Sequence, residues 1–169
     1  MEWFMDVLLI IGIVLFVIFI LLLIIRFLFF REYAIVMGNF ETLIKVLETR
    51  DLLLMRLLPE IKNKKIKDDM SLLVSERMDA KRLGNDKLIE TDVKINKKLN
   101  RIYTELNNSQ NPIVREELRR IVSLEKKLKV IRREYNKAVE VYNNKLTNHP
   151  KIMIKFWKMR PLNLYDIHV

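Results

Sequence analysis

The sequence predicts an all-α protein in which one N-terminal transmembrane helix is followed by an antiparallel bundle of about four helical segments. Three observations predict this fold class. Residues 7–25 form an apolar run, apolar residues beyond Arg31 recur at spacings of three and four, and the 169 residues include only three Gly and four Pro. A period near 3.6 indicates helices with one apolar face, and so few Gly and Pro argue against a turn-rich β-sandwich.

The apolar run predicts a membrane anchor. Nineteen residues from Val7 to Ile25 carry no polar side chain, and as a helix they would extend ~28 Å, close to the ~30 Å hydrocarbon core of a bilayer. An interfacial helix would keep a polar face, and a cleavable signal peptide would begin with basic residues rather than with Glu2 and Asp6. We therefore expect an uncleaved signal anchor over residues 7–30, after a short segment over residues 1–6.

The distribution of charge predicts the orientation of this anchor. Lys and Arg number 31 against 21 Asp and Glu, a net charge of +10, and every basic residue lies at or beyond Arg26. The positive-inside rule places the basic flank in the cytoplasm. We therefore expect residues 1–6 outside the cytoplasmic membrane and a cytoplasmic helical body over residues 31–148. Candidate membrane-interface residues are Arg26, Arg31, Trp157 and Lys158.

The body divides into four expected helical segments, at about residues 32–62, 70–83, 86–107 and 112–148. The first continues the membrane helix, with Pro59 near its end because proline kinks or stops a helix. Residues 62–69 have the composition of a charged connector, which is usually a solvated turn, with binding of phosphate or lipid as the alternative. Asn111 can cap the last helix, and Pro112 can occupy its first turn without losing a hydrogen bond.

The pair Gly84-Asn85 suits a helix C-cap and a turn. If the chain reverses there, the body is an antiparallel four-helix bundle and the C-terminal tail, residues 149–169, returns to the membrane. If the second and third segments run on as one helix, the tail ends far from the membrane. We favour the reversal. The tail mixes bulky apolar and basic residues, which suits either packing on the bundle or an anionic membrane surface.

The last segment carries the clearest packing seam. Its apolar residues follow steps of four and three, namely Val114, Leu118, Ile121, Leu128, Tyr135, Val139, Tyr142 and Leu146. Glu125 and Arg132 interrupt this seam with opposite charges. Each could reach a partner on another helix and set the register, or both could lie at the edge of the seam with their charged ends in water.

A dipeptide repeats within this seam, since Tyr135-Asn136 recurs seven residues later as Tyr142-Asn143. Heptad spacing returns side chains to nearly the same helix face. We therefore expect the two Tyr rings to stack along the seam and the two Asn to hydrogen-bond between helices. A groove for a ligand or a peptide is the alternative.

The C-terminal third resembles the LemA family of bacterial membrane proteins. The residues that match the spacing of the family pattern are Glu125, Leu128, Arg132, Tyr135, Asn136, Val139, Tyr142, Asn143, Leu146 and Pro150. The first half of the chain matches less well: Arg50-Asp51-Leu52-Leu53 resembles the family's Arg-rich Asp-Leu-Ile-Pro-Asn segment, but Leu54-Met55 stand where the family has Pro-Asn. The resemblance implies an all-α bundle on one transmembrane helix, in a family without an established enzymatic activity. Related magnetosome-membrane proteins imply organising work at a membrane.

The residues favour a structural and interaction protein that self-assembles or scaffolds a partner at the inner face of the bacterial cytoplasmic membrane. The expected partners are the lipid bilayer and either a second copy or another membrane protein. The basic body suggests binding of anionic lipid or another polyanion as the alternative, although signs alternate along the helices, and nucleic acid is not an expected partner. Without Cys, a Gly-rich phosphate loop or a paired-His motif, we expect no enzymatic activity, cofactor or metal.

Overall fold

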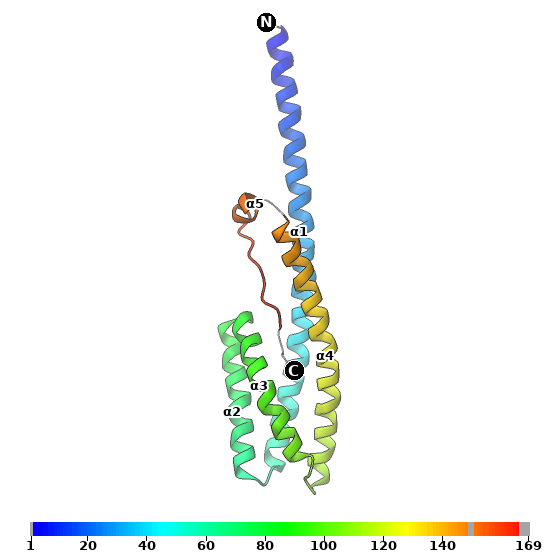
Figure 1. Cartoon of the computed structure of the whole chain (residues 1–169), viewed down its shortest axis with the longest axis vertical. Helices are drawn as coiled ribbons and strands as arrows, with labels where there is room; N and C mark the ends of the chain where they lie inside the picture. The colour runs from blue at the N-terminus through cyan, green and yellow to red at the C-terminus, as the bar shows by residue number, and fades with distance from the viewer. Residues whose placement is uncertain (1, 149–150, 166–169) are drawn as a thin grey trace.

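The computed structural model describes residues 2–148 and 151–165, and within these ranges the regular elements are helices and no strand is present (Figure 1). The all-α fold class is therefore confirmed. In chain order the elements are α1 (Glu2–Leu57), the 3₁₀ helix η1 (Leu58–Glu60), α2 (Lys64–Leu83), α3 (Asn85–Leu106), α4 (Pro112–Thr147) and α5 (Lys151–Phe156).

Helix α1 joins the apolar run to the bundle without a break. Its 56 residues extend ~84 Å. Among the residues that the structure describes, this is the one helix long and apolar enough to cross a membrane. Deep burial along α1 begins at Phe29, which is 2% exposed.

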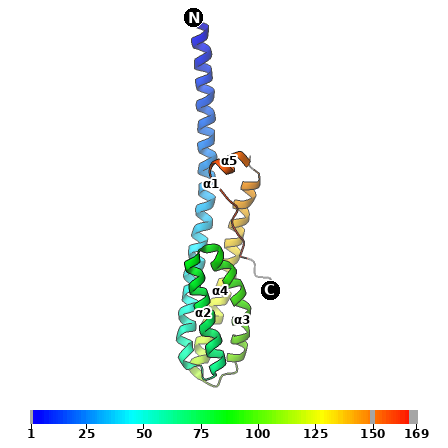
Figure 2. The same cartoon turned by 90° about the vertical axis from the view of Figure 1, so that its left-hand side faces the viewer.

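The bundle is antiparallel. α1 runs away from the N-terminal end, α2 returns toward it, α3 runs away again and α4 returns (Figures 1 and 2). α1 pairs most closely with α4, and α2 with α3. The α2–α3 hairpin is much shorter than α4, about 30 Å against about 54 Å. The part of the α1–α4 seam nearest the apolar run therefore extends beyond the hairpin.

The prediction of a charged connector over residues 62–69 is wrong, because α2 already begins at Lys64. Asn63 is the N-cap, and its side-chain Oδ1 accepts hydrogen bonds from the backbone N–H of Lys65 at 3.0 Å and of Ile66 at 3.4 Å. This cap satisfies N–H groups that the first helical turn leaves without partners. The run of charges therefore forms the exposed face of the first helical turns.

The chain reverses at Gly84, as expected. This single residue separates α2 from α3 and has φ 108° and ψ 172°. Residues with a Cβ rarely adopt such a backbone conformation, whereas glycine does so readily. The reversal aligns α3 with α2 and leaves α4 to return along α1.

Two glycine substitutions test the role of this turn. Gly84→Ala should lower the free energy of unfolding by about 1–3 kcal/mol, because alanine is strained at this φ. Gly38→Ala is the matched control, since Gly38 lies within α1 with open space where the methyl group of alanine would lie and alanine favours helix by about 0.5–1 kcal/mol. Thermal unfolding of the intact chain in detergent, followed by circular dichroism, should show a lower Tm for Gly84→Ala and a higher Tm for Gly38→Ala. Equal shifts would refute the role given to Gly84.

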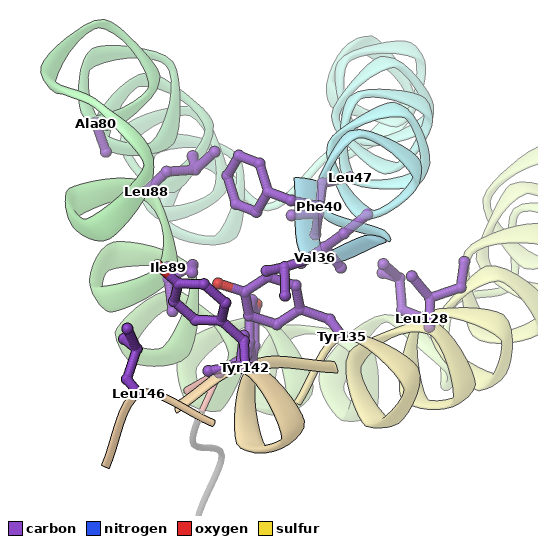
Figure 3. Close-up of a cluster of buried hydrophobic side chains, with 14 of the residues drawn as sticks. Val36, Phe40, Leu47, Ala80, Leu88, Ile89, Leu128, Tyr135, Tyr142 and Leu146 are labelled. Atoms are coloured by element: carbon purple, nitrogen blue, oxygen red, sulfur yellow. The ribbon is translucent and has the colours of Figure 1, made fainter. Parts of the chain in front are cut away.

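Two apolar clusters form the core. The cluster nearer the apolar run is drawn in Figure 3 and includes Val36, Phe40, Leu128, Tyr135 and Tyr142. The farther cluster includes Leu54, Met70, Leu99 and Ile121. Along α1, a pair of charged residues lies between the residues of the two clusters.

Candidate functional site

Six charged residues from all four bundle helices meet between the two apolar clusters. We call them the charged layer: Arg50 and Asp51 from α1, Arg77 from α2, Asp92 from α3, and Glu125 and Arg132 from α4. Three guanidinium groups thus face three carboxylates, so the charges balance. Each helix of the bundle contributes at least one member.

Arg50 and Asp92 form the centre of this layer, and both side chains are fully buried. The two side chains are ion-paired, and Arg50 Nη1 also donates to Glu125 Oε1 at 3.2 Å. From the other side, Arg132 Nη2 donates to Asp92 Oδ2 at 3.1 Å. One carboxylate of α3 therefore joins guanidinium groups from α1 and α4.

A second pair joins α2 to α1. Arg77 Nε donates to both carboxylate oxygens of Asp51, at 2.8 and 2.7 Å. Arg77 Nη1 also lies 3.8 Å from Asp92 Oδ1, which connects this pair to the central one. Charge-assisted contacts of this kind are directional, so they fix the relative height of the helices.

Burial and neighbouring charges act differently on these groups. Burial alone would lower the pKa of Arg50, but the carboxylates of Asp92 and Glu125 raise it above its ordinary value. Burial lowers the pKa of Arg132 below the ordinary value, although the same two carboxylates oppose that shift. Removing one carboxylate would therefore leave buried positive charge uncompensated.

Glu125 and Arg132 thus contact other helices, and they do not lie at the edge of the seam in water. Arg50, Asp51, Arg77 and Asp92 were not predicted as site residues from the sequence. A signal for Asp92 exists, since it lies four residues after Leu88 and three before Ile95 on the apolar stripe of α3. A charge at such a position requires buried partners.

A second site lies on α4 at the level where the α2–α3 hairpin ends, since Gly84 and Asp86 line one pocket with Tyr142 and Leu162. There the tail segment, residues 160–165, runs beside α4 in the opposite direction (Figure 1). Asn136 donates to the backbone O of Tyr165 at 2.9 Å and accepts from its N–H at 2.7 Å. Asn143 makes the same pair with Leu162, at 2.9 and 3.0 Å.

The two tyrosines of the repeat add main-chain contacts. Tyr135 donates its hydroxyl to the backbone O of Asn163 at 3.1 Å, and Tyr142 to that of Arg160 at 3.4 Å. Burial raises the pKa of Tyr135 to about 12, with the carboxylate of Asp86 adding to the shift. The Tyr135 hydroxyl therefore stays protonated, and able to donate, well above neutral pH.

Tyr135, Asn136, Tyr142 and Asn143 together form what we call the cradle. Its spacing matches that of the tail segment. Seven helical residues rise ~10.5 Å, and three residues of extended chain cover ~10 Å. The two Asn therefore bind two residues of the tail segment that are three positions apart, and the two Tyr do the same. Because these contacts are to main-chain atoms, they place little demand on the side chains of the bound segment.

The expectations for the Tyr-Asn repeat need correction. The Tyr rings do not stack on each other: Tyr135 packs on Phe40 and Tyr142 on Tyr33, with ring centroids 5.8 and 5.9 Å apart. The Asn side chains bind the tail segment and not another helix. The physical reason is that the tail segment lies against this face of α4 and offers main-chain N–H and C=O groups to both Asn side chains.

A further contact joins the bound tail segment to the charged layer. Tyr165 is 2% exposed, and the guanidinium carbon of Arg132 lies 4.9 Å from the centroid of its ring. This is the geometry of a cation–π contact. Arg132 therefore contacts both Asp92 in the layer and the tail segment bound in the cradle.

The remaining predicted residues lie in two regions. Leu128, Val139 and Leu146 are buried in the core, and Pro150 lies outside the described residues. Arg26, Arg31 and Lys158 are exposed, whereas Trp157 is half-buried with its ring centroid 6.3 Å from that of Phe29.

No group of three or more His, Asp or Glu placed to hold a metal ion occurs within residues 2–148 and 151–165. Comparison of the chain with family models, with curated proteins and with solved structures finds no match.

Proposed function

We propose that this chain is a membrane-anchored helical interaction protein, which self-assembles or scaffolds a partner at the inner face of the bacterial cytoplasmic membrane. The observation that carries this proposal is the continuity of α1. One helix includes both the apolar run and Arg50 at the centre of the charged layer. A bundle built on such a helix is held at a fixed height above a bilayer, which suits a docking surface.

Two features of the sequence support the cytoplasmic position of the bundle and its organising role. Arg26 and Arg31 follow the apolar run, and no basic residue precedes it, which favours a cytoplasmic bundle. The pattern of residues from Glu125 to Pro150 resembles the LemA family, whose membership we propose for this chain. That resemblance supports an organising role without catalysis.

Size-exclusion chromatography with chemical crosslinking of the intact chain in detergent tests this proposal. We expect a species larger than one chain with its detergent belt, either a homo-oligomer or a complex with another membrane protein. A strictly monomeric chain with no copurifying membrane protein would count decisively against it.

Binding of anionic lipid is a second candidate, and the position of α5 favours it. This short helix lies beside α1 near the end of the apolar run (Figures 1 and 2), where Trp157 packs on Phe29. Exposed basic residues lie on both elements and in the turn after α5: Arg26 and Arg31 on α1, Lys151 and Lys155 on α5, and Lys158 in the turn. Each basic side chain near an anionic surface contributes about 1 kcal/mol.

Native mass spectrometry of the intact chain tests this second candidate. Phosphatidylglycerol should remain bound in preference to phosphatidylcholine, and Lys151→Gln with Lys155→Gln should reduce that preference several-fold. The matched control is Lys97→Gln with Lys98→Gln, two exposed lysines on α3, which should leave it unchanged. Equal retention of both lipids by the unmodified chain would exclude lipid recognition at α5.

A further inference from the structure

The cradle on α4 holds the tail segment through main-chain atoms. Asn136 and Asn143 each pair with both the N–H and the C=O of one residue, and the two Tyr hydroxyls bind further carbonyls. A second copy of this chain offers the same main-chain atoms and the same Tyr165 ring. The cradle therefore cannot distinguish its own tail segment from that of another copy.

The seam beside the cradle requires a cover. Leu162, Met159 and Trp157 pack against the cluster nearer the apolar run, and Leu162 and Met159 line one pocket with Gly84 at the end of the α2–α3 hairpin. If the tail segment left the cradle, this apolar surface would be exposed to water, which is unfavourable. The tail segment of a neighbouring copy would cover it with the same side chains.

A strained residue marks the hinge for such an exchange. Lys158, between α5 and the tail segment, has φ 53°. Residues other than glycine adopt this left-handed conformation reluctantly, and here two hydrogen bonds at the C-cap of α5 hold it, from Lys158 N–H to Lys155 O at 3.2 Å and from Met159 N–H to Ile154 O at 3.0 Å. A tail that extends to another copy is free of this constraint. Strained hinges of this kind favour exchange of identical elements between copies.

Membrane anchoring brings the exchanging parts to the same height. Because α1 is continuous, every copy in one bilayer would hold its cradle and its tail segment at the same distance from the membrane. In two copies related by a two-fold axis along the membrane normal, the tail segment of each copy then lies at the height of the other copy's cradle. Confinement to two dimensions also raises the effective concentration of the second copy.

We propose that neighbouring copies exchange their tail segments, each binding residues 160–165 of the other in its cradle, with Lys158 as the hinge. This inference deepens the proposed function and rests on the membrane anchor. The ligand of the cradle is thus the main chain of an extended peptide, and its occupant is the tail of a second copy.

Coexpression of two differently tagged full-length chains tests the exchange. The cradle variant carries Asn136→Leu with Asn143→Leu. The tail variant carries Leu162→Pro with Tyr165→Pro, which remove the two N–H donors that the cradle binds. After purification through one tag in detergent, two unmodified chains should copurify, and two cradle variants should copurify at least about tenfold less. A cradle variant with a tail variant should copurify again, because an intact cradle meets an intact tail.

Substitutions at the hinge test the same proposal without touching the cradle. Lys158→Pro cannot adopt φ 53° and should increase copurification. Lys158→Gly relieves the strain and should decrease it, by roughly five-fold or more. If the two substitutions change copurification in the opposite directions, or by the same amount, Lys158 is not the hinge.

The outcomes separate the inference from the proposed function. If the cradle variants copurify as well as unmodified chains, the copies assemble through another surface and tail exchange is wrong. If no second copy is recovered but another protein binds in a cradle-dependent way, the occupant is that partner and tail exchange is again wrong. If neither a second copy nor a partner is recovered, both the inference and the proposed function fail.

Discussion

Replacing Asp92 by asparagine should destabilise the bundle by about 3–5 kcal/mol. The fully buried Asp92 side chain contacts Arg50 and Arg132, so the neutral amide leaves buried guanidinium groups without sufficient negative charge. Thermal unfolding of the intact chain in detergent should show Tm lower by roughly 6–20 °C. Proteins rarely tolerate such an uncompensated buried charge, so failure of the variant chain to accumulate in cells would be the extreme form of the same effect.

Two further variants control this result. Glu90→Gln removes a carboxylate from the same helix, where it pairs only with exposed lysines, and should leave Tm nearly unchanged. Asp92→Asn combined with Arg132→Gln removes one charge of each sign and should recover part of the lost stability. If Asp92→Asn matched Glu90→Gln, the charged layer would have no structural role.

Replacing both Asn136 and Asn143 by leucine should release the tail segment from α4. The substitutions remove four hydrogen bonds to Leu162 and Tyr165 and leave main-chain groups without partners, which should cost ~2–4 kcal/mol in docking free energy. Because the chain has no cysteine, a single Leu162→Cys reports docking cleanly. Its labelling by a thiol reagent should accelerate ~30- to 1,000-fold in the double variant.

Asn144→Leu is the matched control for this experiment. Asn144 lies next to Asn143 on α4, but its side chain is exposed. Its replacement should leave the labelling rate of Leu162→Cys unchanged. Equal acceleration by the control would mean that labelling reports general loosening of α4 and not release of the tail segment.

Local sequence signals were sufficient for most of the fold. The apolar run, the seams and the Gly84-Asn85 turn each depend on residues close in the chain, so pattern and propensity predict them. The start of α2 was missed because the charges at residues 62–69 suggested a turn, whereas Asn63 caps a helix there. A cap depends on one side chain and can override the composition of several neighbours.

The two sites were predictable to different degrees. The positions of Glu125 and Arg132 in a seam indicated charges near the core, but the pairing with Arg50 and Asp92 depends on how three helices meet. The repeat of Tyr135-Asn136 predicted hydrogen bonds between helices, with a groove for a ligand or a peptide as the alternative. The sequence left open that the tail packs on the bundle, but it did not indicate the cradle as the place, because the Asn and Tyr side chains bind main-chain atoms, which every segment offers.

Residue-resolved amide hydrogen exchange at Leu162 and Tyr165 tests the central claim most directly, that the Tyr-Asn repeat is a main-chain binding site. Both amides donate to cradle asparagines, so in the unmodified chain they should exchange at least ~30-fold more slowly than in an unstructured peptide of the same sequence. That protection should disappear in Asn136→Leu with Asn143→Leu. Exchange of both amides at the unstructured rate in the unmodified chain would contradict the account.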